Sequence, residues 1–415
     1  MIVSRIEKHI INSNNEFYSL LDNFCFKSKN LYNHANYIVR QEFCNTNKWI
    51  RYSELDTILK NDSEYPDYRN MPTAQSSQQI LRLIDKNWTS FFKSIKDWSK
   101  NKDKYSGRPK LPKYKNKNGR NILILTNQNI KLKGEVIYFP KTFKDFSLKP
   151  QCINKEDFCS IQQVRFIPRN NYIEVEIVYN IKTKDMIPDN GRYMSIDIGL
   201  DNLTAIANNY GQRPFLINGK GLKSINQYYN KIISHYRSIA KQLNKLEYTK
   251  RMERLTNKRN FKVEDIIHKS SRYIVNKAIK DGVSVIVIGY NKNWKQHSKM
   301  SRKVNQQFVQ IPFNTLLQQI QYKANDVGIK VILIEESYTS GTSFLNNELP
   351  VKEFYDKKRR IKRGLFKSNN GKLINSDINA SYQIMKKEFP NAFQQGYGIE
   401  GLVLSPFKVN ISLIH

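Results

Sequence analysis

The chain has 415 residues and a formal net charge of +33 at pH 7, because 69 Lys and Arg outnumber 36 Asp and Glu. This length accommodates two or three domains with substantial cores. No apolar run approaches the roughly 20 residues of a transmembrane helix, so a membrane protein is not expected. So large a basic excess favours a polyanionic partner, by default nucleic acid.

The remaining global features indicate a cytosolic protein without structural zinc. Residues 1–8 lack the apolar core of a secretory signal peptide. Cys25, Cys44, Cys152 and Cys159 are widely scattered and form no Cys-x-x-Cys pair, so we interpret them as reduced thiols rather than zinc ligands. We expect a protein of the bacterial cytoplasm that associates with the nucleoid when it is bound to DNA.

The first part of the chain is predicted to contain one strand and two long helices. Residues 1–11 are predicted as the strand. Apolar residues at helical spacing predict a helix over residues 17–39 and another over residues 72–98, which opens at Pro72, a favoured position for proline. Residues 61–70 form the loop between them, and the two helices are expected to pack together as a helical lobe.

Residues 100–120 combine many cations with Pro, Gly and aromatic residues. This composition favours an extended backbone that follows nucleic-acid phosphates, with a solvated basic loop as the alternative interpretation. The candidate nucleic-acid-binding residues in this segment are Lys104, Arg108, Lys110, Lys113 and Lys115.

Short alternating apolar runs then predict an antiparallel sheet or small β-barrel, which residues 1–11 would complete. The predicted strands span residues 122–125, 136–139, 164–167 and 173–179.

The apolar run over residues 193–200 is predicted to be a buried strand, yet it contains Asp197. Burying a carboxylate costs several kcal/mol unless a cation or donors compensate it. Two further strand-like runs follow, at residues 203–207 and 214–217. A strand with one buried Asp, followed by such a meander, is typical of the start of RNase H-like nucleases. A capping or turn Asp is the alternative.

The rest of the chain places more acids at element edges. A basic helical hairpin is predicted over residues 221–280, with Lys220 and Lys223 at its start as candidate nucleic-acid contacts. A strand, a helix and a second strand then indicate a right-handed crossover of an α/β sheet. Glu335 and Glu336 end the second strand, and Asp377 begins a helix.

Clustered Asp and Glu are the expected ligands for hard divalent cations. Two Mg²⁺ ions about 4 Å apart can activate water and neutralise the scissile phosphate during phosphodiester hydrolysis. We therefore take Asp197, Glu335, Glu336 and Asp377 as candidate catalytic and metal-binding residues for two Mg²⁺ ions, for which Mn²⁺ could substitute.

The chain resembles the TnpB family, RNA-guided nucleases that insertion sequences encode and that are ancestral to type V CRISPR effectors. The resemblance covers nearly the whole chain. The segments that carry it are residues 71–98, Gly107-Arg108-Pro109-Lys110-Leu111-Pro112, Ile196-Asp197-Ile198-Gly199-Leu200-Asp201-Asn202-Leu203, residues 219–226, Tyr338-Thr339-Ser340, Arg363-Gly364-Leu365-Phe366 and Asn375-Ser376-Asp377-Ile378-Asn379-Ala380.

This resemblance implies a multidomain α+β protein: a helical recognition lobe and a β-barrel wedge domain, followed by an RNase H-like (RuvC) α/β nuclease domain with a basic insertion. It also implies a guide RNA, double-stranded target DNA and its displaced single strand as partners. The implied segments are residues 1–11 (first barrel strand), 12–105 (recognition lobe), 106–185 (rest of the barrel), 186–340 (nuclease), 341–372 (insertion), 373–390 (last nuclease helix) and 391–415 (tail).

Two departures from the family pattern matter. The second RuvC carboxylate of most members falls at Gly289, which cannot bind metal. We favour its relocation to Glu335 or Glu336, because a missing side chain at residue 289 leaves room for a longer one from the next strand. Strand alternation lets only one of the two face the metal ions.

The second departure is the insertion, where the family's four zinc-binding cysteines are missing, so we expect no zinc. Its basic residues would still contact DNA phosphates. The candidates are Arg359, Arg360, Lys362 and Arg363.

Three functions compete at this point. The first is an RNA-guided DNA endonuclease, either of the TnpB type or a compact type V CRISPR effector derived from it. The second is a nuclease-dead, RNA-guided repressor. The third is a transposase proper, which is weakest because the chain lacks the His-hydrophobe-His and tyrosine arrangement of single-strand transposases. The oligomeric state stays open.

Overall fold

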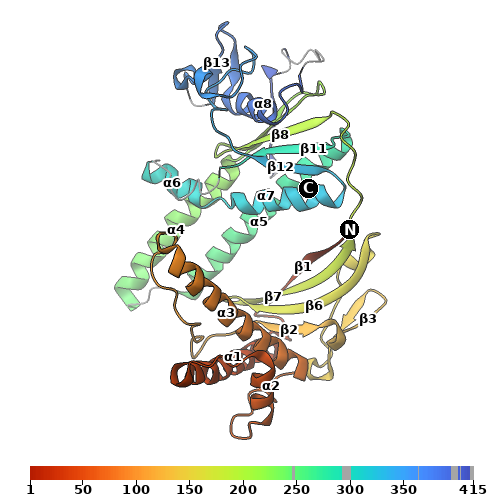
Figure 1. Ribbon diagram of the computed structural model, residues 1–415, viewed down its shortest axis with the longest axis vertical. Coiled ribbons are helices and arrows are strands. Elements are labelled where there is room, and N and C mark those ends of the chain that lie inside the picture. The colour runs from red at the N-terminus through yellow and green to blue at the C-terminus, as the bar shows by residue number, and fades with distance from the viewer. Residues whose placement is uncertain (245–247, 292–300, 363, 394–400, 402, 412–415) are drawn as a thin grey trace. The chain divides into compact units, whose positions relative to one another are not determined.

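The computed structural model describes residues 1–244, 248–291, 301–362, 364–393, 401 and 403–411 (Figure 1). The chain divides into two compact units. We call residues 2–182 the N-terminal unit, and residues 183–415 together with Met1 the C-terminal unit.

Three helices make up the helical part of the N-terminal unit: α1 (Tyr18–Thr46), α2 (Tyr52–Asn61) and α3 (Ala74–Lys100). Helix α3 begins with a capping box, in which the Thr73 side chain accepts from the Ser76 backbone while the Ser76 side chain accepts from that of Thr73. The fully buried Trp88 of α3 donates its indole N–H to Asn36 of α1 at 3.1 Å, which ties the two long helices together. Helix α2 was not predicted; it is short and buries only Leu55 and Leu59.

The strands of the N-terminal unit form two antiparallel sheets. One has the order β1-β7-β6-β2, and the other has the order β3-β4-β5. An antiparallel sheet or small β-barrel that residues 1–11 would complete was predicted. Strand β1 does pair with β7, but the short strands β3 to β5 pair only among themselves within the described residues. The strand bounds are β1 (Ile2–Asn12), β2 (Leu123–Thr126), β3 (Lys131–Lys133), β4 (Val136–Tyr138), β5 (Ser147–Leu148), β6 (Phe158–Pro168) and β7 (Tyr172–Lys182).

A six-stranded sheet with the order β12-β11-β8-β9-β10-β15 organises the C-terminal unit. Strands β8, β9 and β10 form an antiparallel meander, while β11 and β12 continue the sheet parallel to β8. The predicted tail contributes β15, which pairs in parallel with β10. The bounds are β8 (Tyr193–Ile198), β9 (Asn202–Asn208), β10 (Phe215–Asn218), β11 (Val285–Gly289), β12 (Lys330–Ile334) and β15 (Phe407–Val409).

Helices cover both faces of this sheet, and the sheet is therefore buried, as is usual in α/β folds (Figure 1). Helices α5 and α7 pack on one face, and α8 packs on the other against β8, β9 and β11. The predicted basic hairpin is formed by α4 and α5. The helix bounds are α4 (Lys220–Asn244), α5 (Lys250–Lys280), α6 (Arg302–Val309), α7 (Phe313–Asp326) and α8 (Ser376–Glu388).

The insertion ends in a small hairpin of β13 (Leu365–Lys367) and β14 (Leu373–Asn375), which leads directly into α8. Its boundary therefore lies three residues beyond the predicted residue 372. Among the described residues, no helix combines the length and apolar composition that crossing a lipid bilayer requires.

Candidate active site

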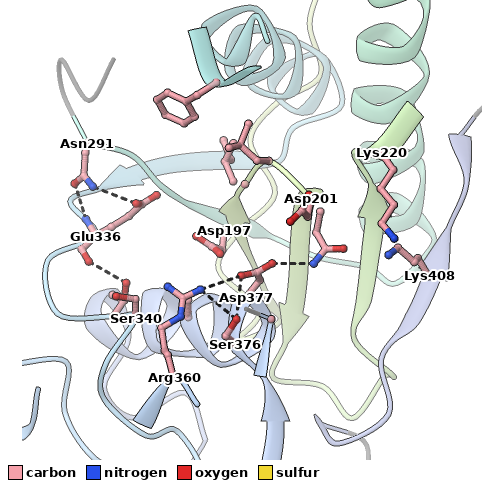
Figure 2. A pocket seen from close by; sticks show the side chains of 18 residues that line it. Asp197, Asp201, Lys220, Asn291, Glu336, Ser340, Arg360, Ser376, Asp377 and Lys408 are labelled. Carbon is pink, nitrogen blue, oxygen red and sulfur yellow. Dashed lines mark hydrogen bonds and ion pairs between the residues drawn. The ribbon is translucent and has the colours of Figure 1, made fainter. Parts of the chain in front are cut away.

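Strand alternation places Asp197 on the α8 side of the sheet. Its neighbours Ile196 and Ile198 are buried in the core that α5 and α7 cover. Ser195, two residues earlier and therefore on the same side as Asp197, meets Ser381 of α8 at 3.1 Å. Asp197 thus points into a cavity of about 580 Å³ that lies between the strand ends and the start of α8 (Figure 2).

Asp377 reaches the same cavity from the first turn of α8. The Asn375 side chain caps this helix by accepting from the backbone N–H of Asp377 and Ile378. The Asn202 Nδ2 donates to Asp377 Oδ2 at 2.8 Å, and the Arg360 guanidinium lies 3.7 Å from Oδ1. A helix N-terminus also favours a negative charge, so three local effects hold the carboxylate of Asp377 in place.

Glu336 supplies the third carboxylate. It lies two residues beyond β12 and lines the cavity, where its Oε2 accepts from Asn291 Nδ2 at 3.1 Å. Its Oε1 is buried and has no hydrogen-bond partner in the structure. Glu335, the other candidate, is exposed and accepts from the Ser337 hydroxyl instead. Of the two alternatives that the sequence left open, Glu336 and not Glu335 is among the residues that line the cavity.

The position of Glu336 depends on the glycine beside it. A Cβ added to Gly289 would lie 2.7 Å from both Cγ and Oε1 of Glu336, and 2.5 Å from Ile384 Cδ1. Such distances are well below van der Waals contact. Any other residue at position 289 would displace the Glu336 carboxylate from its observed place.

Two of these acids have a raised pKa. Burial, followed by the nearby charges of Glu336 and Asp377, raises the pKa of Asp197 well above its ordinary value, against the opposing effect of Arg360. Burial raises the pKa of Glu336 to about 7. Carboxyl groups in such surroundings are poised to exchange their protons for a cation.

The cavity could hold a divalent cation only with help from water or substrate. Among the described residues, no three acidic, histidine or cysteine side chains are already gathered closely enough to cage an ion. Mg²⁺ commonly keeps several water ligands and takes only one or two carboxylates together with phosphate oxygens. The donors present, all carboxylate oxygens, suit that ion.

Cations lie at the margin of the cavity (Figure 2). Lys220 and Lys408 line it, and Arg360 reaches into it from the insertion. Lys223, in contrast, is half-buried and forms an ion pair with Asp201 at 2.5 Å, and its predicted contact with nucleic acid stays a prediction. Sequence reasoning missed Asn202, Asn291 and Lys408. Of these, only Asn202 carried a signal, since it follows the carboxylate strand directly at the start of β9.

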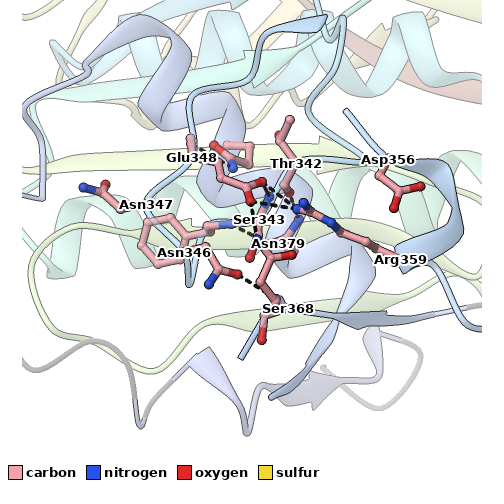
Figure 3. Close-up of polar contacts among 12 residues, drawn as sticks. Thr342, Ser343, Asn346, Asn347, Glu348, Asp356, Arg359, Ser368 and Asn379 are labelled. Atoms are coloured by element: carbon pink, nitrogen blue, oxygen red, sulfur yellow. Dashed lines mark hydrogen bonds and ion pairs between the residues drawn. The ribbon is translucent and has the colours of Figure 1, made fainter. Parts of the chain in front are cut away.

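Arg359 and Arg360 turn out to have different surroundings. Arg359 donates to Glu348, with Nη1 2.6 Å from Oε2, and only 17% of its side chain is exposed (Figure 3). Glu348 also accepts from the Ser343 backbone and the Asn369 side chain. In this structure Arg359 contacts an acid within the insertion, and its predicted role in nucleic-acid binding stays a prediction.

Of the other two candidate residues of the insertion, Lys362 and Arg363, the structure describes only the first. Lys362 is exposed, as a phosphate contact requires. Arg363 lies outside the described residues.

The basic segment of the N-terminal unit is extended and held by α1. Asn33 exchanges two hydrogen bonds with the backbone of Lys115, and Asn36 donates to the Pro112 carbonyl at 3.1 Å. Because side chains of α1 bind the backbone of this basic segment, the basic side chains of the segment point outward. Lys104, Arg108, Lys110, Lys113 and Lys115 are exposed or half-buried.

Comparisons with known proteins cover most of the chain. Residues 176–295 match the OrfB_IS605 family, described as a probable transposase, and residues 313–384 match the Cas12f1-like TNB domain. The chain is similar to the TnpB-like protein ORF457 of Acidianus two-tailed virus, with 21% identity over 392 residues, which cover 87% of this chain and 81% of the viral protein.

Two solved structures are similar over nearly the whole chain, at low TM-scores. One is Cas12f1 in a complex with sgRNA and target DNA, with a TM-score of 0.36 and 15% identity over 93% of this chain and 100% of that chain. The other is the mini-RNA-guided endonuclease Cas_phi3, with a TM-score of 0.46 and 8% identity over 93% of this chain and 92% of that chain.

Proposed function

We propose that the chain is an RNA-guided DNA endonuclease of the TnpB type, on the basis of its similarity to the OrfB_IS605 family, the Cas12f1-like TNB domain and a TnpB-like viral protein. The observation that carries the proposal is the convergence of Asp197, Glu336 and Asp377 on one cavity from three different elements. Burying three carboxylates together is unfavourable unless cations compensate them. A site that binds metal ions during phosphodiester hydrolysis explains that cost.

Asp197, Glu336 and Asp377 would hold Mg²⁺ or Mn²⁺. Three features support this assignment: the partnerless Oε1 of Glu336, the raised pKa of Asp197 and Glu336, and an all-oxygen donor set. When bound, such ions supply an activated water and neutralise the charge that develops on the phosphate.

The other residues of the cavity would orient the substrate and the carboxylates. Asn202 fixes one oxygen of Asp377 and leaves the other oxygen toward Arg360. Arg360 is a planar donor that suits a phosphate, and it is free to exchange Asp377 for the scissile phosphate once metal neutralises that acid. Lys220 and Lys408 would hold neighbouring phosphates of the same strand.

Guide RNA and target DNA follow as the proposed partners. The net charge of +33 is of the sign that two polyanions require, and the exposed cations of the segment along α1 offer one surface for them.

A nuclease-dead RNA-guided repressor is the second candidate, and Gly289 favours it, because that position bears no carboxylate. The location of Glu336 favours the active enzyme. Its side chain fills the space that Gly289 leaves and faces the same cavity.

The test begins with expression of the protein from its natural locus and sequencing of the RNA that copurifies. The complex is then offered double-stranded DNA that matches the guide, with randomised flanking bases, in Mg²⁺ or Mn²⁺. We expect one defined RNA and cleavage of the matched DNA. Random host RNA alone contradicts guided recognition, whereas guided binding without cleavage supports the repressor.

A further inference from the structure

We propose that Asn291 is a positioning residue for cleavage, which turns the Glu336 carboxylate into the cavity and leaves one of its oxygens for a metal ion. This inference rests on the proposed nuclease function. It concerns a residue two positions beyond the end of β11, the strand whose own last residue is a glycine.

Asn291 and Glu336 bind each other through two hydrogen bonds. The Asn291 Nδ2 donates to Glu336 Oε2 at 3.1 Å, and the Glu336 backbone N–H donates to Asn291 Oδ1 at 3.2 Å. One asparagine therefore fixes both the backbone and the side chain of the same glutamate (Figure 2).

These bonds continue the pairing of two parallel strands beyond its end. Gly289 is paired with Ile334, and the Tyr290 N–H donates to the Ile334 carbonyl at 2.8 Å. Beyond this point the Asn291 side chain takes the place of a backbone partner. Glu336 lies outside β12, so strand geometry alone does not direct its side chain.

The contact makes the two oxygens of Glu336 unequal. Oε2 accepts from Asn291, while Oε1 is buried without a partner. Asn202 makes a similar contact with Asp377, in which the Asn202 Nδ2 donates to Asp377 Oδ2 at 2.8 Å. Each of these carboxylates is thus held through one oxygen by a neutral amide. Residues that fix ligand orientation in this way commonly change metal affinity 10- to 100-fold when they are removed.

The test compares Asn291→Ala with wild type in two measurements. The first is Mn²⁺ binding to the full chain without substrate DNA, followed by electron paramagnetic resonance. The second is the Mg²⁺ concentration needed for half-maximal cleavage by the guide-loaded protein. We expect Mn²⁺ binding to weaken about 10-fold. Cleavage should recover at high Mg²⁺, and guided DNA binding should stay unchanged.

A double-mutant cycle distinguishes positioning from general support of the fold. In the Glu336→Gln background, Asn291→Ala should weaken Mn²⁺ binding no further, because the proposed effect passes through the carboxylate of Glu336. An equal further loss in that background would overturn the inference. Asn291→Ser, whose hydroxyl cannot span both partners, serves the same comparison if the alanine variant fails to fold.

Asn218→Ala is the matched control. Asn218 supports the start of α4 next to Lys220, so Asn230→Ala is used beside it as the stricter control: Asn230 exchanges two hydrogen bonds with Gln310, is not among the residues that line the cavity, and its variant should resemble wild type. If wild type binds Mn²⁺ and cuts while Asn291→Ala matches it in both measurements, the positioning role is wrong and the nuclease stands. If wild type neither binds Mn²⁺ nor cuts, the proposed function itself fails.

Discussion

The carboxylate of Glu336 occupies the space next to Gly289 that a side chain at position 289 would need, since an added Cβ would lie 2.7 Å from Oε1. Gly289 is the last residue of β11, and Glu336 lies two residues beyond the end of the neighbouring parallel strand, β12. An acid can therefore reach the same cavity from either strand, but not from both at once. This relationship explains how a nuclease could lose the acid at position 289 and keep its chemistry.

Glu336→Gln should abolish Mg²⁺-dependent cleavage while leaving guided DNA binding intact, because glutamine keeps the volume and removes the charge that a metal ion needs. Glu335→Gln is the matched control, and we expect cleavage close to wild type, since the Glu335 carboxylate is exposed and accepts from its neighbour Ser337, whereas Lys387 contacts only the Glu335 backbone. Cleavage of labelled DNA and a gel-shift assay measure the two properties. A severe Glu335→Gln with a mild Glu336→Gln would reverse the assignment.

Gly289→Ala should also impair cleavage, although the substitution adds only one methyl group. The new Cβ would push away the Glu336 carboxylate, and overpacking of this kind typically costs 1–3 kcal/mol. Combining Gly289→Glu with Glu336→Gly should restore part of the activity by returning the acid to β11. Single-turnover cleavage rates of the three variants check this. An active Gly289→Ala would show that Glu336 does not need its observed position.

The metal-free protein should lose stability as the pH rises from about 4 to about 7. Folding raises the pKa of Asp197, and that of Glu336 to about 7, whereas both acids have pKa values near 4 in an unfolded chain. Their contribution is thus fully present below the unfolded pKa and is lost as the pH passes the folded one. Mg²⁺ replaces the lost protons, so its stabilising effect should grow over the same range.

Thermal unfolding with and without Mg²⁺, at about pH 5 and about pH 8, measures this difference. The double variant Asp197→Asn with Glu336→Gln should show a much smaller pH dependence of the Mg²⁺ effect. Lys323, whose pKa burial lowers to about 8, makes the folded protein more stable with rising pH only above that value. An Mg²⁺ effect of the same size at both pH values would contradict the prediction.

Arg359→Gln should mainly lower stability, whereas Arg360→Gln should mainly slow cleavage. Arg360 reaches Asp377, so its loss should slow cleavage at least 10-fold with little change in stability. Loss of Arg359 leaves the buried Glu348 without its cation, which costs on the order of 3 kcal/mol and should loosen the insertion. Hydrogen exchange over residues 341–372 and cleavage rates separate the two effects. Equal protection in both variants would show that the Arg359 contact does not hold the insertion.

Local sequence patterns predicted those parts of the site that depend on a single element. The alternation of β8 sets the side on which Asp197 lies, and the start of α8 fixes Asp377. The choice between Glu335 and Glu336 could not be predicted, because both lie beyond the end of β12. The residue that bonds Glu336 and not Glu335 is Asn291, which is 45 residues away in the sequence. Arg359 and Arg360 are neighbours with the same charge, and only the buried Glu348 distinguishes them.

The same distinction holds for the fold. The long helices and the central strands have strong apolar periodicity and were predicted. Strand β15 has three residues, too few to show apolar periodicity. It forms because it pairs in parallel with β10 at the edge of the sheet. The splitting of the N-terminal strands into two sheets likewise depends on non-local pairing, which no short window of sequence contains.

The pairing of β15 with β10 has a consequence for how the protein is made. On the ribosome, the N-terminal unit can close as soon as β7 emerges to meet β1. The six-stranded sheet keeps an open edge at β10 until β15 has been synthesised. A nascent chain that does not yet include Asp377 lacks one of the three acids of the cavity, so on the proposed function it could not yet cleave DNA.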